Sequence, residues 1–415
     1  MLLKLGAHGL DGVVDRCDHE MRGPYELPPG PEGFSFSLYQ SIGVALQAGH
    51  RLELLENGSV FDRMQADIRS ARESVHMLVY LWRPCDVSDR IVEALVERAR
   101  EGVACRVVVD PVGSEVVSGD RDFDQKVGRV LSEAGVEVHY YRMLAANAVG
   151  RLLGRTHQKL VIIDGRIAYT GGFGIWDAWD GDGLSPEQWR DASVRVEGPC
   201  ACEMQLSFSR YWQESGGGLL PPSCFPELEQ EGRAKACFVE SSGKLGITDA
   251  ERMVRMVIAA ARERLWIANA YFSPPDEILK QLEEKCRQGV EIRILGPGPI
   301  HDVKFFRASQ RSTYERLLEA GVRVYEYQPS MIHAKTMLVD DWLAVVGSSN
   351  LDSLSLNKMG EGSLVMNDAR FVRELGRCWA KDLTVSREIS LEKGGRTNPW
   401  RRLARKATQL VGHTR

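Results

Sequence analysis

The residues best suited to chemistry are two histidine–lysine pairs at the same spacing. His157 and Lys159 stand two positions apart in HQKLVIID, as His333 and Lys335 do in HAKTMLVD. The apolar residues after each pair predict a buried strand, on which positions two apart share a face. An imidazole can attack phosphorus when neutral or protonate a leaving oxygen when charged, and a lysine offsets charge on phosphoryl oxygens. Each pair therefore suits phosphate chemistry.

Each pair begins a longer motif: His-x-Lys, four residues, Asp, six residues, then Gly-Gly or Gly-Ser. The other motif residues are Asp164, Gly171 and Gly172 in the first copy, and Asp340, Gly347, Ser348 and the following Asn350 in the second. Asp164 and Asp340 are motif carboxylates and hence catalytic candidates. Asp164 is an odd number of positions from His157, however, and Asp164-Gly165 is typical of a two-residue hairpin turn. We favour a turn role over direct catalysis.

The motif is repeated because much of the chain is repeated. SARESVHMLVYLW, from Ser70, returns as AARERLWIANAYF, from Ala260, and EAGVEVHYY returns as EAGVRVYEY. Helical segments alternate with apolar strands in both copies, which predicts an α/β fold with one sheet per half and helices on its faces. A pseudo-twofold axis between the halves would place the two histidines on opposite sides of one shared site. One could then attack while the other supplies a proton, provided that their environments separate their pKa values.

The repeats divide the chain into five parts. Residues 1–48 form an N-terminal segment without a functional interpretation, 49–213 the first half, 214–236 a linker rich in Gly, Pro and acidic residues, 237–385 the second half, and 386–415 a basic tail. The first half carries about ten extra residues before its motif, in MLAANAVGRLLGRT. We weigh a substrate-contacting loop and a plain surface loop equally there.

Composition excludes several classes of protein. The 53 Lys and Arg against 57 Asp and Glu give a net charge of −4, so a strongly basic nucleic-acid binder is not expected. No apolar run approaches the ~18 residues of a membrane span, and the N-terminus lacks a signal-peptide core. The nine scattered cysteines are typical of reduced thiols in a cytosolic protein. No metal-ligand cluster appears, so we expect neither a metal nor another cofactor.

The doubled HxKx4Dx6G(G/S) spacing resembles the signature of the phospholipase D superfamily, over about residues 52–375. Flanking segments such as WRDASVRVEGP, LLEAGVRVYEYQPSMIHAK and VGSSNLDSLSL are similar to those of bacterial cardiolipin synthases. The lack of two N-terminal membrane helices resembles the shorter branch of that family. The resemblance implies an internally duplicated phospholipase D-like fold, with two α-β-α sandwich halves and one shared active site.

The resemblance also assigns roles to the motif residues. One histidine becomes a covalent phosphohistidine, and the other acts first as an acid and then as a base. Since the N-terminal histidine is more often the nucleophile in the family, we expect His157 in that role and His333 as the acid. Lys159, Lys335 and Asn350 would bind the phosphate oxygens.

Carboxylates downstream of each motif orient the histidines in this family. The matching residues are Asp191, in WRDASV, and Glu361, in GEGSLV, but the sequence does not say which serves which histidine. There are two departures from the family pattern. Gly174 stands where the second motif has Asn350, and LNKMGEG does not fit the usual Asn-x-Glu spacing. Neither removes a histidine or lysine, so we expect an active enzyme.

The function implied is a phosphatidyl transferase that joins two phosphatidylglycerol molecules into cardiolipin and releases glycerol. If water resolves the intermediate instead, the same residues make a phospholipase D that releases phosphatidic acid. A nuclease of the superfamily and a lipid-binding pseudoenzyme are less favoured alternatives. The sequence leaves the oligomeric state open.

The C-terminal tail is the candidate for contact with the lipid surface. KGGRTNPWRRLARKATQLVGHTR contains seven Lys or Arg and no acidic residue. Apolar residues recur at helical spacing, and the interfacial and basic positions are Trp400, Arg401, Arg402, Arg405 and Lys406. Such a helix suits an anionic membrane surface, the alternative being a solvated helix or a disordered tail. We therefore expect a cytoplasmic protein bound peripherally to the inner face of the cell membrane.

Overall fold

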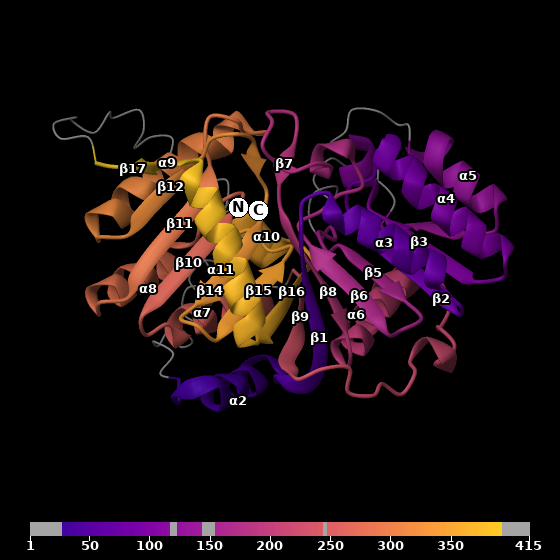
Figure 1. Cartoon of the computed structure of the whole chain (residues 1–415), viewed down its shortest axis with the longest axis horizontal. Helices are drawn as coiled ribbons and strands as arrows, with labels where there is room; N and C mark the ends of the chain where they lie inside the picture. Colours follow the sequence, from indigo (N-terminus) through magenta and orange to yellow (C-terminus); the bar gives the residue numbers. More distant parts are fainter. Residues whose placement is uncertain (1–26, 117–122, 143–153, 244–246, 392–415) are drawn as a thin grey trace, which may run out of the picture.

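Two halves lie side by side in the computed structural model, which describes residues 27–116, 123–142, 154–243 and 247–391 (Figure 1). The strands of the first half are β1 (Gln47–Glu56), β2 (Ser74–Val79), β3 (Ala104–Val109), β4 (Glu137–Tyr140), β5 (Leu160–Ile163), β6 (Ile167–Gly171), β7 (Trp189–Arg190) and β8 (Ala192–Glu197). Those of the second are β9 (Ala234–Ser241), β10 (Arg264–Asn269), β11 (Glu291–Pro297), β12 (Arg323–Tyr327), β13 (Met331–Ile332), β14 (Lys335–Val339), β15 (Leu343–Gly347), β16 (Glu361–Asn367) and β17 (Ser386–Ile389).

The strand order confirms the duplication. The first half runs β1-β8-β6-β5-β2-β3-β4, and the second runs β9-β16-β15-β14-β10-β11-β12 with β17 beyond it. The two half-sheets are not separate, because β1 and β9 pair antiparallel at the centre and join them into one sheet of fifteen strands. The sequence predicted one sheet per half and gave no sign of this join, which satisfies two edges that would otherwise be unpaired.

Helices cover both faces of the sheet. In the first half they are α3 (Ser59–Ser70), α4 (Asp86–Arg100), α5 (Arg129–Glu133) and α6 (Cys200–Glu214). In the second they are α7 (Asp249–Ala260), α8 (Asp276–Arg287), α9 (Lys304–Glu319), α10 (Ser353–Lys358) and α11 (Ala369–Thr384), and α2 (Gly30–Ile42) precedes both halves. Alternate residues of β2 belong to two different cores, Met77 and Val79 to one and Leu78 to the other. This is the predicted α-β-α sandwich.

One core is common to both halves. It contains Phe208 and Trp212 of α6, Phe371 and Trp379 of α11, and inward residues of the central strands. The opposite face has a separate core in each half. The halves are therefore fused along one face as well as along the sheet, which fixes the position of each motif relative to the other.

The segments outside the two halves differ in their structure. Phe34 and Leu38 of α2 are buried in the core of the second half, so part of residues 1–48 packs against the repeat. β17, in the predicted tail, pairs with β12. Residues 143–153 of the predicted insert and the proposed membrane-binding residues Trp400, Arg401, Arg402, Arg405 and Lys406 lie outside the described residues. Within the described ranges we find no helix long and apolar enough to span a bilayer.

Candidate active site

The first motif histidine is fixed by a backbone contact with the second half. His157 lies just before β5, and its N–H donates to the carbonyl of Gly360 at 2.7 Å. Gly360 in turn donates to the carbonyl of Arg155 at 2.7 Å. The residue after Gly360 is Glu361, the first of β16. This exchange places a carboxylate of the second half beside the histidine of the first.

The second histidine is held by the same exchange in the opposite direction. β13 pairs parallel with β7, and the His333 N–H donates to the carbonyl of Arg190 at 2.7 Å. The next residue after Arg190 is Asp191. His333 therefore follows a short strand that pairs across the two halves, and His157 follows a single bridge between Thr156 and Gly360, whereas the sequence predicted that both lie within the motif strands.

The cross-half pairing decides which carboxylate faces which histidine. His157 Nδ1 lies 3.1 and 3.2 Å from the two carboxylate oxygens of Glu361, and His333 Nδ1 lies 3.1 Å from Asp191 Oδ2. Each carboxylate serves the histidine of the other half. An Nδ1–H donated to a carboxylate leaves the Nε2 lone pair available to a substrate. All four residues are at most 7% exposed, so the dyads are shielded from bulk water.

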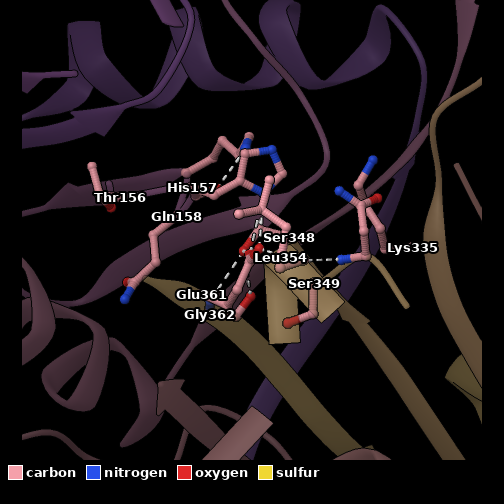
Figure 2. Close-up of polar contacts among 12 residues, drawn as sticks. Thr156, His157, Gln158, Lys335, Ser348, Ser349, Leu354, Glu361 and Gly362 are labelled. Carbon is pink, nitrogen blue, oxygen red and sulfur yellow. Dashed lines mark hydrogen bonds and ion pairs between the residues drawn. The ribbon is translucent and has the colours of Figure 1, made fainter. Parts of the chain in front are cut away.

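Two serines surround the Glu361 carboxylate. The hydroxyls of Ser348 and Ser355 both donate to it, and Ser348 also accepts from the Gly362 N–H at 3.0 Å. Figure 2 shows Ser348 and Glu361 together below His157, with Lys335 to the right of them. Asn350 lies nearby through its N–H, which donates to Ser355 Oγ at 2.9 Å. Its buried Oδ1 makes no hydrogen bond within the described part of the chain, so this side chain remains available to a ligand.

The Asp191 carboxylate has different neighbours. Trp179 Nε1 donates to Oδ2 at 2.8 Å, and the Ala192 N–H donates to Oδ1 at 2.8 Å. A Cβ at Gly172, the position that matches Ser348, would lie 2.4 Å from Oδ2, and one at Gly171 would lie 2.5 Å from the side chain of Ser193. The glycines of the first motif are therefore required by the close approach of β8.

Gly174 has a packing explanation. A Cβ at this position would lie 3.0 Å from the ring of Trp179 and 3.2 Å from Leu81. The indole that binds Asp191 thus fills the space beside Gly174. Gly174, which departs from the family motif, therefore makes room for the indole that binds the Asp191 carboxylate.

Both motif lysines point back to their own histidines. The Nζ of Lys159 donates to the carbonyl of His157 at 2.5 Å, and the Nζ of Lys335 lies 2.9 Å from His333 Nδ1. Burial, which penalises the charged form, lowers the pKa of Lys159 to about 7 and that of Lys335 to about 8. Near neutral pH the site is therefore close to losing positive charge unless an anion is bound.

The pKa values of both histidines and of both carboxylates lie below their usual values. Burial and the neighbouring lysines lower the pKa of His157, and they lower that of His333 to about 4. Burial alone would raise the pKa of Asp191 and Glu361, but their histidine partners hold both below the usual values. In the ligand-free site both histidines are neutral and both carboxylates are ionised.

The motif aspartates do not reach the histidines. Asp164 accepts the backbone N–H groups of Arg72, Glu73 and Ser74 at 2.8–3.2 Å, with φ of 52° in the turn between β5 and β6. Asp340 accepts the corresponding three N–H groups from residues 262–264. The structure places both as turn residues that bind the start of a neighbouring strand, away from the chemistry.

Several residues at the site were not predicted from the sequence. Tyr80 packs edge-on against His157 at 5.0 Å, and Trp179 and Trp189 flank the ring of His333 at 5.2 and 5.0 Å. Buried Asp110 accepts the Thr156 N–H at 3.2 Å beside the first motif. Tyr80 and Asp110 directly follow β2 and β3, a position that could have indicated them. The tryptophans had no such signal. Among the described residues, no cluster of ligands suited to a metal ion is present.

Comparisons with known proteins identify the family and the fold. A family model described as "Cardiolipin synthase, PLD-like domain" matches residues 64–212 and 254–382. Cardiolipin synthase 1 of Bacillus cereus is 30% identical over 348 residues, 81% of this chain and 67% of that protein. Cardiolipin synthase A of Erwinia tasmaniensis is 31% identical over 370 residues, 87% and 75% of the two chains. The crystal structure of a phosphatidylserine synthase from Haemophilus influenzae Rd KW20 shares the fold, with a TM-score of 0.63 at 13% identity over 91% of this chain and 99% of that one.

Proposed function

The chain belongs to the cardiolipin synthase family of phospholipase D-like proteins, and we propose that it joins two phosphatidylglycerol molecules into cardiolipin and glycerol. The observation that carries the proposal is the pair of buried histidine–carboxylate dyads, each built from both halves, with a lysine beside each histidine. Displacement at phosphorus needs a nucleophile and an acid, and this site holds two histidines suited to those roles.

In the first step His157 Nε2 attacks the phosphorus of one phosphatidylglycerol. A P–N bond forms, the P–O bond to glycerol breaks, and His333 gives its proton to the departing glycerol oxygen. Glu361 stabilises the cation that develops on His157, and Lys159 and Lys335 offset charge on the phosphoryl oxygens. We assign Asn350 the role of a further, neutral donor to these oxygens through its Nδ2–H₂ group.

His333 is neutral before substrate binds, yet this step requires its proton. The phosphodiester brings a negative charge between two buried lysines, which favours the charged form of a nearby imidazole. Binding of the substrate therefore raises the pKa of His333, and Asp191 holds the resulting imidazolium. The acid is charged only when a phosphate group is in the site.

In the second step the hydroxyl of another phosphatidylglycerol gives its proton to His333 and attacks phosphorus. The P–N bond breaks, His157 is released, and cardiolipin forms. Water in place of that hydroxyl gives phosphatidic acid, so the first step is common to a transferase and a hydrolase. The dyad geometry serves both outcomes, and the family supports the transferase.

Mass spectrometry of lipids after the purified protein meets phosphatidylglycerol vesicles tests the proposal. We expect cardiolipin and free glycerol, with losses of about 10⁴-fold or more in His157→Ala and His333→Ala. Phosphatidic acid as the main product would instead identify a hydrolase. Wild-type protein that converts no phosphatidylglycerol would contradict both.

We further propose that the basic tail from Lys393, outside the described residues, binds the protein to the inner face of the cell membrane. Its Trp400 and basic residues suit an anionic surface, with about 1 kcal/mol for each basic residue near it. Sedimentation with anionic vesicles, for the full chain and for a chain ending at Glu392, tests this. Equal binding of the two would remove the tail from the account.

A further inference from the structure

Arg190 occupies the interface between the two halves next to the second dyad. Its side chain is 5% exposed, and every guanidinium nitrogen is bound. Nε donates to Asp382 of α11 at 2.8 Å, Nη2 to Glu56 of β1 at 3.0 Å, and Nη1 to Asn57 Oδ1 at 3.1 Å and to the Asp191 carbonyl at 2.6 Å. One side chain thus connects α11 of the second half with β1 and the Asp191 carbonyl of the first.

The main chain of Arg190 is itself part of the site. Its carbonyl accepts the His333 N–H, and the next N–H, that of Asp191, donates to Asn57 Oδ1 at 2.9 Å. Asn57 therefore binds both the guanidinium and the backbone that carries the Asp191 carboxylate. A displacement of Arg190 would move both members of the His333–Asp191 dyad.

The other half-site has no equivalent side chain. The position that binds the His157 N–H is Gly360, where a Cβ would lie 2.1 Å from the Tyr211 hydroxyl. The Glu361 carboxylate that follows Gly360 is held by the hydroxyls of Ser348 and Ser355. Among the described residues, a buried arginine directly before the dyad carboxylate is therefore found at the His333 half-site alone, and the buried Arg155 near His157 donates to the carbonyls of Tyr141 and Arg142.

A planar guanidinium is suited to this position. It directs donors in fixed directions to several acceptors, which the point charge of a lysine cannot do. Its burial is balanced by the carboxylates of Asp382 and Glu56, because a buried charge needs paired partners. We propose that Arg190 is a positioning residue for His333. By joining α11 to the strand of Asp191, it fixes the geometry in which His333 protonates the leaving oxygen.

The test uses the dependence of the rate on the leaving group, and it rests on the proposed function. An alkyl ester such as phosphatidylglycerol needs a proton on its leaving oxygen, whereas the p-nitrophenyl ester of phosphatidic acid does not. Since general acid catalysis is worth about 10²–10⁴-fold, we expect Arg190→Lys to lower kcat for phosphatidylglycerol by about 100-fold. For the aryl ester we expect p-nitrophenolate release in the first turnover, which precedes the step in which His333 acts as a base, to slow by about threefold or less.

Arg195→Lys is the matched control. The Arg195 side chain is 4% exposed, against 5% for Arg190, and it is also paired with carboxylates, those of Asp67 and Glu197, but none of its hydrogen bonds within the described part of the chain reaches the dyad. Its variant should lose thermal stability without a difference between the two esters. Asp382→Asn, which removes the charge from the link to α11 at the other end, should reproduce the ester difference at about tenfold, and it carries the test if Arg190→Lys does not fold.

Equal losses on both esters in Arg190→Lys and Asp382→Asn, or an ester difference of the same size in Arg195→Lys, would overturn the inference. Failure of the proposed function has a separate signature. In that case wild-type protein cleaves the aryl ester but releases no glycerol from phosphatidylglycerol. The role of Arg190 is then judged with the ethyl ester of phosphatidic acid as the alkyl substrate.

Discussion

At His157 the partner carboxylate, Glu361, is bound by two serine hydroxyls, whereas at His333 the partner, Asp191, is bound by the indole of Trp179 and by a backbone amide. The backbone of the two half-sites is the same: a short cross-half contact that places a carboxylate beside a histidine. The duplicated fold therefore supplies the symmetry, and the side chains around each carboxylate remove it. A double displacement needs that inequality, since one histidine attacks while the other moves protons.

The aromatic residues add to the contrast. Trp179 and Trp189 flank His333, while His157 has Tyr80 beside it. An apolar wall around His333 strengthens its dependence on Asp191, because a low dielectric increases the interaction between the imidazolium and the carboxylate. His333 is thus suited to hold a proton only while substrate is present.

Removing the charge of either dyad carboxylate should have the largest effect on kcat and should show most clearly how the two half-sites differ. Asp191→Asn and Glu361→Gln each leave one histidine without its anion, and we expect losses of about 10²–10⁴-fold in kcat for phosphatidylglycerol. In the first turnover of the p-nitrophenyl ester Asp191→Asn should lose far less than Glu361→Gln, because formation of the adduct then requires only the nucleophile. Steady-state rates on phosphatidylglycerol and first-turnover release of p-nitrophenolate measure this. Equal patterns for the two variants would mean that the half-sites are interchangeable.

The lysines predict the pH dependence. Lys159 and Lys335, with pKa values of about 7 and 8, are charged below these values and neutral above them. The low pKa of His333 in the free enzyme already makes kcat/KM fall with rising pH, and the fall should become steeper above about pH 7 as the two lysines lose their charge. A bound phosphate raises both pKa values, so kcat should fall only at higher pH. A profile of kcat/KM that is flat to pH 9 would contradict the predicted loss of charge.

Gly172→Ala would test the close packing of the first half-site. The new Cβ would lie 2.4 Å from Asp191 Oδ2, so the carboxylate must move, and we expect a loss of about tenfold in kcat. Gly376→Ala is the control, because nothing lies within 4 Å of a Cβ there and alanine favours the helix α11. Kinetics and melting temperatures compare the two. Full activity in Gly172→Ala would show that the Asp191 carboxylate tolerates displacement.

The smallest effect on turnover is expected for the motif aspartates. Asp164→Ala and Asp340→Ala each leave backbone N–H groups without their acceptor, which should cost about 1–2 kcal/mol of the free energy of unfolding. Their kcat should change by about threefold or less, since neither contacts a histidine. Chemical denaturation and steady-state kinetics separate the two effects. A loss of kcat in a fully folded variant would return these residues to the catalytic group.

Much of the fold was accessible from the sequence because the repeat fixes the order of elements twice. The His-x-Lys pairs, the turn at Asp164-Gly165 and the α/β halves all follow from local pattern. The partners of the carboxylates did not, because Asp191 and Glu361 reach the histidines through contacts more than 140 residues apart in the chain. The same holds for Arg190, whose role depends on α11 packing against β1.

The most direct test of two unequal histidines is to trap the covalent intermediate. Wild-type protein, His157→Ala and His333→Ala are mixed with the p-nitrophenyl ester of phosphatidic acid, quenched within one turnover and digested for peptide mass spectrometry under conditions that preserve phosphohistidine. We predict a phosphatidyl adduct on His157 that accumulates in His333→Ala, because nothing then activates the acceptor, and no adduct in His157→Ala. An adduct on His333, or adducts on both histidines alike, would contradict this division of roles.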